Sequence, residues 1–465
     1  MPHDSGISLP SPPAPLPRGE GSRPLRGAVI GGAIVASLGS LLFGFDTVVI
    51  AGTTEALQSV FHLDAFWLGF TVAIALIGTI VGSCAVGKPA DVFGRKNVLF
   101  ALAACYFVSS AGCGLAQTWW EFLIARFLGG LAIGGTSVVT PLYIAEISPP
   151  HLRGRLVMIN QLNIVLGILL CCVSNYVVAR YFPFEVAWRW MLGILAFPAA
   201  ILFFLIFSIL ESPRSLVKRG RLVEARRALQ RLAEADVDTA LAAIRASLAD
   251  QPGHVQERLF RRAYWRPIFL ASVMAVFNQL TGINAMLYYA PRIFSMAGAS
   301  RDSSLLQSIA IGGTLFVFTI VAMFIIDRFG RRILLLIGSV GMTLCLALVG
   351  GSFAFGCNGS AGSGRLLLVA LIGSIAFFAM SQGAVMFVFL SEIFPNAIRA
   401  KGQAFGTFIH WSMDAMVTWT FPVVAERFVT GTFAFFAVMM VLQFLFVWKI
   451  MPETKGGALE DIGKR

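Results

Sequence analysis

One phrase occurs twice in this chain: Asp91-Val-Phe-Gly-Arg-Lys96 returns 236 residues later as Asp327-Arg-Phe-Gly-Arg-Arg332. Two further phrases return at spacings of 246 and 242 residues, namely Glu146–Arg153 with Glu392–Arg399, and Glu211–Arg214 with Glu453–Lys455. Three spacings near 240 in a chain of 465 residues indicate that one unit is written twice. Such duplicated halves, when they are built from membrane helices, are typical of transporters.

Long apolar runs separate the repeated phrases. Hydrophobic residues make up 57% of the chain and charged residues only 13%, whereas soluble proteins have roughly half and about a quarter. Runs of about 20 residues suffice to cross the hydrocarbon core at about 1.5 Å per residue. Twelve such runs occur, at about 27–52, 66–87, 97–117, 121–146, 156–179, 190–210, 266–294, 305–326, 333–356, 366–391, 401–424 and 429–451. We therefore predict an all-α membrane protein with twelve transmembrane helices in two pseudo-symmetric six-helix bundles.

The runs divide the chain into five segments. The residues before the first run are rich in Pro, Ser and Gly, which is typical of a disordered tail. Between the sixth and seventh runs, Leu222, Ala225, Leu229 and Leu232 have helical spacing within a polar stretch, which predicts amphipathic helices on the membrane surface. The predicted segments are a cytoplasmic tail (1–26), an N-terminal bundle (27–210), a cytoplasmic helical linker (211–265), a C-terminal bundle (266–451) and a second cytoplasmic tail (452–465).

Lys and Arg are distributed unequally between the loops on the two sides. Six basic residues fall in one set of alternate loops and Arg126 lies inside a run, which leaves 29 of the 36 on the other side. The positive-inside rule places that side in the cytoplasm, together with both termini because the number of spans is even. We predict a multi-pass protein of the cytoplasmic (inner) membrane. Its net charge of +12 then faces anionic lipid and requires no nucleic acid.

The repeated Asp-x-x-Gly-Arg phrase lies in tight loops on the predicted cytoplasmic side. Gly94 and Gly330 allow turns too sharp for a side chain, and nearby acids can cap the next helix or pair with arginine. Because both halves carry the same set, we predict ion-pair clusters that gate the two halves; the alternative is that they serve only as topology signals and helix caps. The predicted gate residues are Asp91, Arg95, Glu146, Arg153, Glu211, Asp327, Arg331, Glu392, Arg399 and Glu453.

Several motifs follow one another along the chain in a fixed order. They are Gly-Arg-Lys96 and Gly-Arg-Arg332, Glu211-Ser-Pro-Arg214, Gln279-Leu-Thr-Gly-Ile-Asn284 with the pair Tyr288-Tyr289, and Pro452-Glu-Thr-Lys-Gly456. In this order they resemble the sugar porter family of the major facilitator superfamily, of the bacterial proton-coupled symporter type, over about residues 27–456. The resemblance implies two six-helix bundles, a central sugar site and alternating access.

Two residues of opposite charge lie at matching depth inside apolar runs. Asp46 in the first run and Arg126 in the fourth both lie about 7–9 Å below the outer surface, taking about 1.5 Å per residue. A charge in the bilayer is costly unless it is paired or lines a cavity, so we predict that the two form a pair. The pair is either static or proton-coupling, with protonation of Asp46 breaking it. The resemblance favours coupling, because proton-coupled sugar porters keep an aspartate here whereas animal uniporters commonly have asparagine.

The predicted pocket contains amide and aromatic side chains. Sugar hydroxyls need both donors and acceptors, which Gln and Asn supply without charge. By resemblance, Gln161, Gln279 and Asn284 match family sugar contacts, and Gly282 loosens the seventh span around the substrate. Taken singly, any one amide could instead join two helices. The predicted substrate-binding residues are Phe43, Gln161, Asn278, Gln279, Asn284, Tyr288, Gly383, Phe387, His410, Trp411 and Asp414.

Some of these positions depart from the family pattern. Asn278 replaces a glutamine, Phe387 a tryptophan, and His410 an amide, while Asp414 replaces another polar residue. Two more departures are Ala384, at a usual proline, and Leu315, at a usual asparagine. His410 and Asp414 lie four residues apart on one helical face. They either satisfy each other as a local pair, or they alter substrate choice or add a second protonatable site.

The leading hypothesis is proton-coupled uptake of a monosaccharide, a pentose or a hexose, by a monomer in contact with membrane lipid. The alternatives are a sugar uniporter, a drug/proton antiporter and a sugar sensor. We expect no enzyme activity, because no nucleophile–base set, phosphate loop or metal cluster occurs in the sequence, and we predict no cofactor and no metal.

Overall fold

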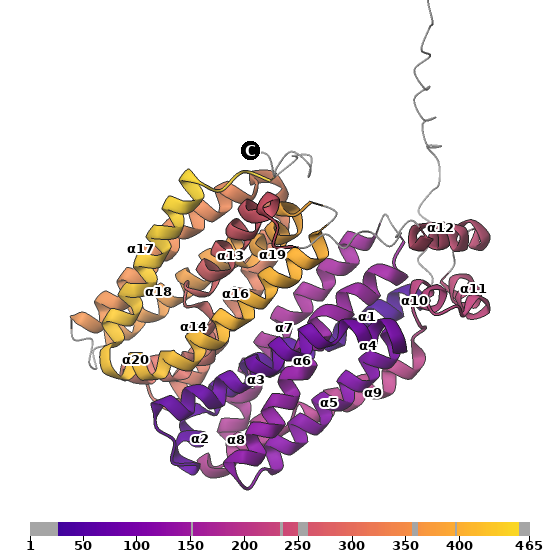
Figure 1. Cartoon of the computed structure of the whole chain (residues 1–465). Coiled ribbons are helices and arrows are strands. Elements are labelled where there is room, and N and C mark those ends of the chain that lie inside the picture. Colours follow the sequence, from indigo (N-terminus) through magenta and orange to yellow (C-terminus); the bar gives the residue numbers. More distant parts are fainter. Residues whose placement is uncertain are drawn as a thin grey trace, which may run out of the picture.

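The structure is a computed structural model that describes residues 27–149, 152–232, 236–249, 259–355, 361–395 and 398–454. Over these ranges all the regular secondary structure is helical. Two bundles lie side by side, one from the first half of the chain and one from the second (Figure 1). The predicted tail 1–26, and residues 455–465 of the predicted second tail, lie outside the described residues.

The first bundle contains six membrane-length segments. Its sixth segment consists of α8 and α9, which follow each other without a polar interruption, and two short helices, α2 and α4, join neighbouring segments. The helices are α1 (Gly27–Val49), α2 (Thr54–Val60), α3 (Ala65–Ala85), α4 (Gly87–Phe93), α5 (Arg95–Leu115), α6 (Trp119–Ile147), α7 (Arg153–Tyr181), α8 (Phe184–Gly193) and α9 (Ala196–Leu205).

The second bundle contains two spans with broken helices, which are the seventh and tenth spans of the chain. Its helices are α13 (Trp265–Gln279), α14 (Ile283–Tyr288), α15 (Ala290–Met296), α16 (Arg301–Phe329), α17 (Arg331–Ala354), α18 (Ala361–Met380), α19 (Gln382–Ile393) and α20 (Arg399–Lys449). The 51 residues of α20 include a non-helical residue, Phe428, at φ −155° and ψ 68°. Because this break divides α20 into two passes, the described residues contain twelve membrane-length segments, as the sequence predicts.

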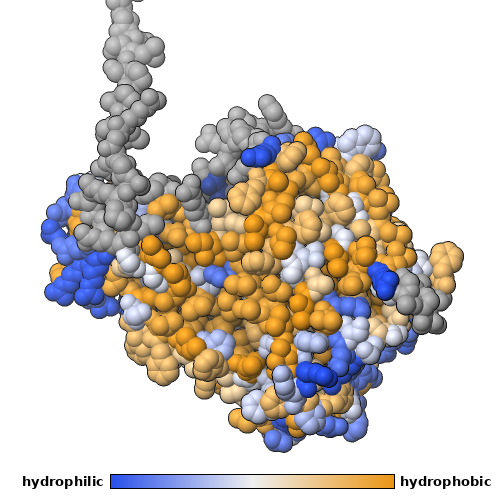
Figure 2. Space-filling model, turned by 180° about the vertical axis from the view of Figure 1, so that it is seen from behind, coloured by the Kyte–Doolittle hydropathy of each residue, from blue (hydrophilic) through white to orange (hydrophobic). Residues whose placement is uncertain are grey.

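Apolar side chains cover both the interior and much of the surface. Phe204 and Phe324 are 68% and 72% exposed, and Figure 2 shows a broad hydrophobic belt with hydrophilic residues gathered toward its ends. Such a belt suits contact with lipid. Because lipid tails are as apolar as the helix side chains, burial of apolar surface alone does not hold the helices together, and they pack through small residues and close backbone contact. At Gly130 of α6, for example, a Cβ would lie 2.0 Å from the carbonyl oxygen of Ala75 in α3.

Three linker helices cover one end of the first bundle (Figure 1): α10 (Pro213–Lys218), α11 (Leu222–Arg231) and α12 (Val237–Ala249). The helix predicted from the leucine spacing is confirmed in α11, where Ala225 and Leu229 are buried. We name this end of the molecule the linker end and the opposite end the far end.

The two bundles meet closely at the far end. There α3 packs against α20, with Gly69 directly beside the backbone of Trp419. The rings of Phe66 and Phe70 lie 5.3 and 5.0 Å from that of Trp419. A polar contact adds to this closure, because Arg292 of α15 donates to Gln58 of α2 over 2.8 Å.

Candidate functional site

A cavity of about 470 Å³ lies between the two bundles. Helices α1 and α7 line it from the first bundle, and α13, α14, α16, α18, α19 and α20 line it from the second. It extends toward the linker end, because Met158 near the start of α7 and Ile326 near the end of α16 are among its walls. Its size falls within the range of pockets that bind small molecules.

All eleven predicted substrate-binding residues line this one cavity. Phe43 and Gln161 come from the first bundle, and the other nine belong to α13, α14, α19 and α20 of the second. Leu315 and Ala384, which depart from the family pattern, also line it.

The break in the seventh span brings two of the amides together. Helix α13 ends at Gln279, and Gly282 takes a left-handed conformation with φ 74° before α14 begins. This confirms the predicted loosening at Gly282, a position where a Cβ would also meet the ring of Phe436 at 2.5 Å. Across the break, Asn284 Nδ2 donates to Gln279 Oε1 over 2.9 Å. The paired amides keep further donors and acceptors for a polar ligand.

His410 and Asp414 face the cavity but contact different partners. The ring nitrogens of His410 both lie 3.2 Å from Gln279 Nε2. The carboxylate of Asp414 accepts from the hydroxyls of Tyr288 at 3.4 Å and Thr418 at 3.2 Å. The hydrogen-bond partners of His410 and Asp414 are therefore other neighbouring residues, and not each other. The apolar side of the same cavity is formed by rings such as Phe43 and Trp411, 6.1 Å apart.

The structure adds polar lining residues that the sequence did not reveal. Gln382 begins α19 after a break at Ser381, and its backbone oxygen accepts from Asn278 Nδ2 over 3.4 Å. Asn160, next to Gln161, accepts a hydrogen bond from Ser40. Both belong to the cavity wall. The signal was an amide within an apolar run, which in the case of Gln382 lies beside Gly383.

Asp46 and Arg126 form a buried pair inside the first bundle. Their side chains are 5% and 2% exposed, and Arg126 donates to Asp46 Oδ1 over 2.8 Å. Asp46 Oδ2 has no hydrogen-bond partner among the described residues. Gly129 leaves room for this oxygen, because a Cβ there would lie 2.9 Å from it. Asp46 lies on α1 between Phe43 and Thr47, two residues that line the cavity, so the pair and the cavity share one helix.

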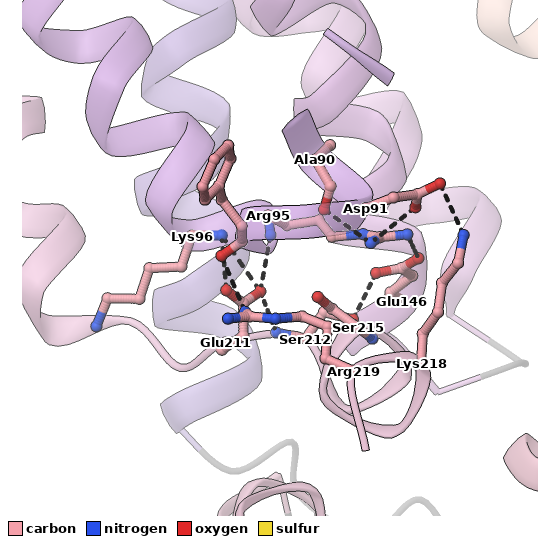
Figure 3. Close-up of polar contacts among 11 residues, drawn as sticks. Ala90, Asp91, Arg95, Lys96, Glu146, Glu211, Ser212, Ser215, Lys218 and Arg219 are labelled. Atoms are coloured by element: carbon pink, nitrogen blue, oxygen red, sulfur yellow. Dashed lines mark hydrogen bonds and ion pairs between the residues drawn. The ribbon is translucent and has the colours of Figure 1, made fainter. Parts of the chain in front are cut away.

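The first predicted gate cluster surrounds Arg95 at the linker end (Figure 3). Arg95 pairs with Glu146 at 2.9 Å and with Asp91 at 3.2 Å, and Lys218 of α10 pairs with Asp91 at 2.7 Å. Glu211 accepts from the backbone nitrogen of Arg95 over 2.9 Å, so its carboxylate caps the start of α5. These contacts join α4, α5 and α6 to the linker within the first half of the chain.

The second cluster repeats this arrangement in the other half. Arg331 pairs with Glu392 at 2.9 Å, and Glu453 accepts from the backbone nitrogens of Arg331 and Arg332, each over 3.0 Å. Thr454 donates to Glu392 over 2.5 Å. Glu453 thus caps α17 as Glu211 caps α5, which explains why the two glutamates recur in the sequence.

The glycine of each repeated phrase makes room for the capping carboxylate. Gly94 has φ 94° and Gly330 has φ 83°, values that favour glycine. A Cβ would lie 2.2 Å from Glu211 Oε2 at Gly94, and 2.8 Å from Glu453 Oε2 at Gly330. Of the remaining predicted gate residues, Arg399 donates from Nε to the carbonyl of Phe394 over 3.4 Å. The side chains of Arg153 and Asp327 lie outside the described part of the structure.

Two pseudo-symmetric helical bundles around a central cavity, lined by apolar and amide side chains, define a membrane transporter that opens between its halves. The sequence matches the family described as "Sugar (and other) transporter" over residues 32–465. The chain belongs to this family, which is the sugar porter family of the major facilitator superfamily.

Relatives and solved structures cover nearly the whole chain. The D-xylose-proton symporter of Escherichia coli is 36% identical over 92% of this chain and 94% of its own. The arabinose-proton symporter of Bacillus subtilis is 35% identical over 94% and 95%. The inward-open structure of the Escherichia coli xylose transporter superposes with a TM-score of 0.83 at 34% identity, covering 94% of this chain and 99% of that one.

Proposed function

We propose that this protein takes up a monosaccharide, a pentose or a hexose, together with protons. The observation that carries the proposal is the shared helix α1, which places a buried carboxylate, Asp46, one turn from residues that line an amide-rich cavity. The names of the relatives, which include D-xylose- and arabinose-proton symporters, support the same class of substrate and the same coupling ion.

The cavity has the chemistry that a neutral polyol requires. Gln161, Gln279 and Asn284 each offer a donor and an acceptor, so that ring hydroxyls can exchange their water contacts for amide contacts. Phe43 and Trp411 offer flat apolar faces for the C–H groups of the sugar. All these residues belong to one chain, so a monomer contains the complete site.

Coupling follows from the state of Asp46. While ionised, the carboxylate holds Arg126 over 2.8 Å and keeps α1 against α6. A proton that adds to the unpartnered Oδ2 removes the negative charge and weakens the pair. Because α1 also lines the cavity, its movement changes the sugar site. Binding of the proton and binding of the sugar are thereby linked.

The linker end faces the cytoplasm in this proposal, as the distribution of Lys and Arg predicts. The cavity extends toward that end while α3 and α20 close the far end, so the molecule is in an inward-facing state. Similarity to an inward-open xylose transporter supports this assignment. The two capping clusters at the linker end are the parts of a gate that closes in the outward-facing state. In the inward-facing state, the ion pairs Arg95–Glu146 and Arg331–Glu392 each stay within one half.

Uptake into proteoliposomes tests the function. Labelled D-xylose, L-arabinose and D-glucose should accumulate above the external concentration when an inward proton gradient is imposed, and should only equilibrate without it. Gln279→Ala should reduce uptake of whichever sugar is transported. Equal uptake with and without the gradient would instead identify a uniporter, and no saturable sugar uptake would refute the proposed substrate class.

A further inference from the structure

Asp414 is a second carboxylate inside the membrane region, and the coupling step at Asp46 does not use it. It is fully buried by the rest of the protein, yet it belongs to the wall of the central cavity. The neutral hydroxyls of Tyr288 and Thr418 donate hydrogen bonds to it. In its place and in its chemistry it differs from Asp46, which contacts a guanidinium and lies within the other bundle.

No basic side chain forms an ion pair with Asp414 within the described ranges of the chain. The ionisable groups around it include Tyr288 on α14, which contacts it, and His410 on its own helix, whose ring contacts Gln279. In the first bundle, Asp46 of α1 is paired with Arg126 of α6. An ionised carboxylate without a cation is costly at this depth, whereas its protonated form is not.

The other helices packed against α20 place no charged side chain at the depth of Asp414. Helix α3 contains no Asp, Glu, Lys, Arg or His. Helices α13, α17 and α19 carry charged residues only near the linker end, and these are Arg266, Arg331, Arg332 and Glu392. The protonation state of Asp414 is therefore governed by burial, by neutral hydrogen-bond donors and by access to water in the cavity.

We propose that Asp414 is a second proton-binding site of the transport cycle, so that two protons accompany each sugar. The proposal rests on the proposed proton-coupled function. In the outward-facing state, a hydronium ion in the cavity transfers a proton to one carboxylate oxygen of Asp414: one O–H bond of the hydronium breaks, a water is left, and a new O–H bond makes the carboxylate a neutral acid. In the opposite state the same O–H bond breaks and the proton returns to water.

The Tyr288 contact connects this step to the movement of the second bundle. Tyr288 ends α14, the short helix after the break at Gly282, and Tyr289 donates to the carbonyl of Thr418 over 3.0 Å. Tyr288 of α14 and Tyr289, which follows it, therefore contact α20 through their two hydroxyls. Helix α14 also packs against α1. One titrating carboxylate acts on α1 and the other on α14, so each bundle has its own proton-sensitive contact with the shared cavity.

The test is a reversal-potential measurement on the full-length protein in proteoliposomes. A fixed gradient of labelled D-xylose, or of whichever sugar the uptake panel shows to be transported, is opposed by a potassium–valinomycin potential until net flux is zero. Each coupled charge changes the sugar ratio at zero flux by about 50-fold per 100 mV. We expect the value for two protons in the wild type, the value for one in Asp414→Asn, and the wild-type value restored in Asp414→Glu.

Two controls separate the possible outcomes. Asp302→Asn makes the same substitution at an exposed carboxylate in the first turn of α16, and it should keep the wild-type reversal potential. If Asp414→Asn does not fold, the wild type alone still tests the proposal, because a wild-type reversal potential that corresponds to one proton overturns it. An unchanged reversal potential in Asp414→Asn, with or without an altered ranking of sugars, also overturns it. A wild type that never accumulates sugar would refute proton coupling itself.

Discussion

Gly69→Ala should shift this transporter toward the conformation that is open at its far end. Gly69 lies on α3 in the first bundle, and a Cβ at this position would lie 2.0 Å from the carbonyl oxygen of Trp419 on α20 in the second bundle. Both atoms belong to the structure in which the far end is closed. The methyl group therefore opposes closure between the halves and leaves the interior of each half unchanged.

The size of the effect follows from that distance. Ordinary contact of a Cβ begins at 3.4 Å, and the obstructing atom belongs to the backbone, so the helices must separate by more than 1 Å. Overpacking of this kind costs about 1–3 kcal/mol. Because the cost falls only on the closed far end, the equilibrium between the two conformations should shift by about 5–150-fold.

Hydrogen–deuterium exchange followed by mass spectrometry measures this shift. In Gly69→Ala, amides of α2 and α15 at the far end should exchange faster by up to that factor, since exchange follows the population of the open form. The control is Gly130→Ala, whose Cβ would also lie 2.0 Å from a carbonyl oxygen, but within the first bundle. It should lower the melting temperature without changing the ratio of exchange between the two ends. Identical exchange patterns in the two variants would refute the reasoning.

Two further predictions concern the coupling pair and the pocket. Asp46→Asn should abolish accumulation of sugar against its gradient but spare counterflow exchange, because the neutral amide removes the titrating group and keeps its shape; a variant that still concentrates sugar would exclude Asp46 as the coupling site. Gln161→Ala, Gln279→Ala and Asn284→Ala should each weaken sugar binding by about 1–3 kcal/mol, the cost of leaving a buried polar group unpaired. Calorimetry on folded protein checks the second prediction, and unchanged binding in all three variants would place the site elsewhere.

Much of the architecture could be predicted because the membrane limits the choices. Apolar runs of spanning length must be helices, and the twelve segments of the structure agree with them. The break at Gly282 was predictable because Gly282 belongs to the family motif Gln279–Asn284, in a span that is expected to unwind around a substrate. The lining residues could be named because family motifs carry them, and all eleven face one cavity.

Contacts that depend on how separate helices dock could not be predicted in the same way. Helical spacing places His410 and Asp414 on one face, but the partners of each are decided by α13 and α14, which a repeat pattern does not position. The contact between Arg292 and Gln58 joins residues 234 positions apart with no shared motif. Gln382 was missed for a related reason, since one amide in an apolar run gives no indication of which side it faces.

The capping glutamates give the repeated phrases the same structural role in both halves of the chain. Glu211 and Glu453 each follow the sixth span of their half and return to cap the third, so each closes its bundle at the linker end. Within the described part of the chain, it is the first half that adds a linker helix to this arrangement, through the pair of Lys218 with Asp91. The connection from one bundle to the other therefore begins at a cluster that already holds three helices of the first bundle. Because the first cluster includes Lys218 of the linker, the two clusters are unequal parts of the proposed gate despite their common sequence.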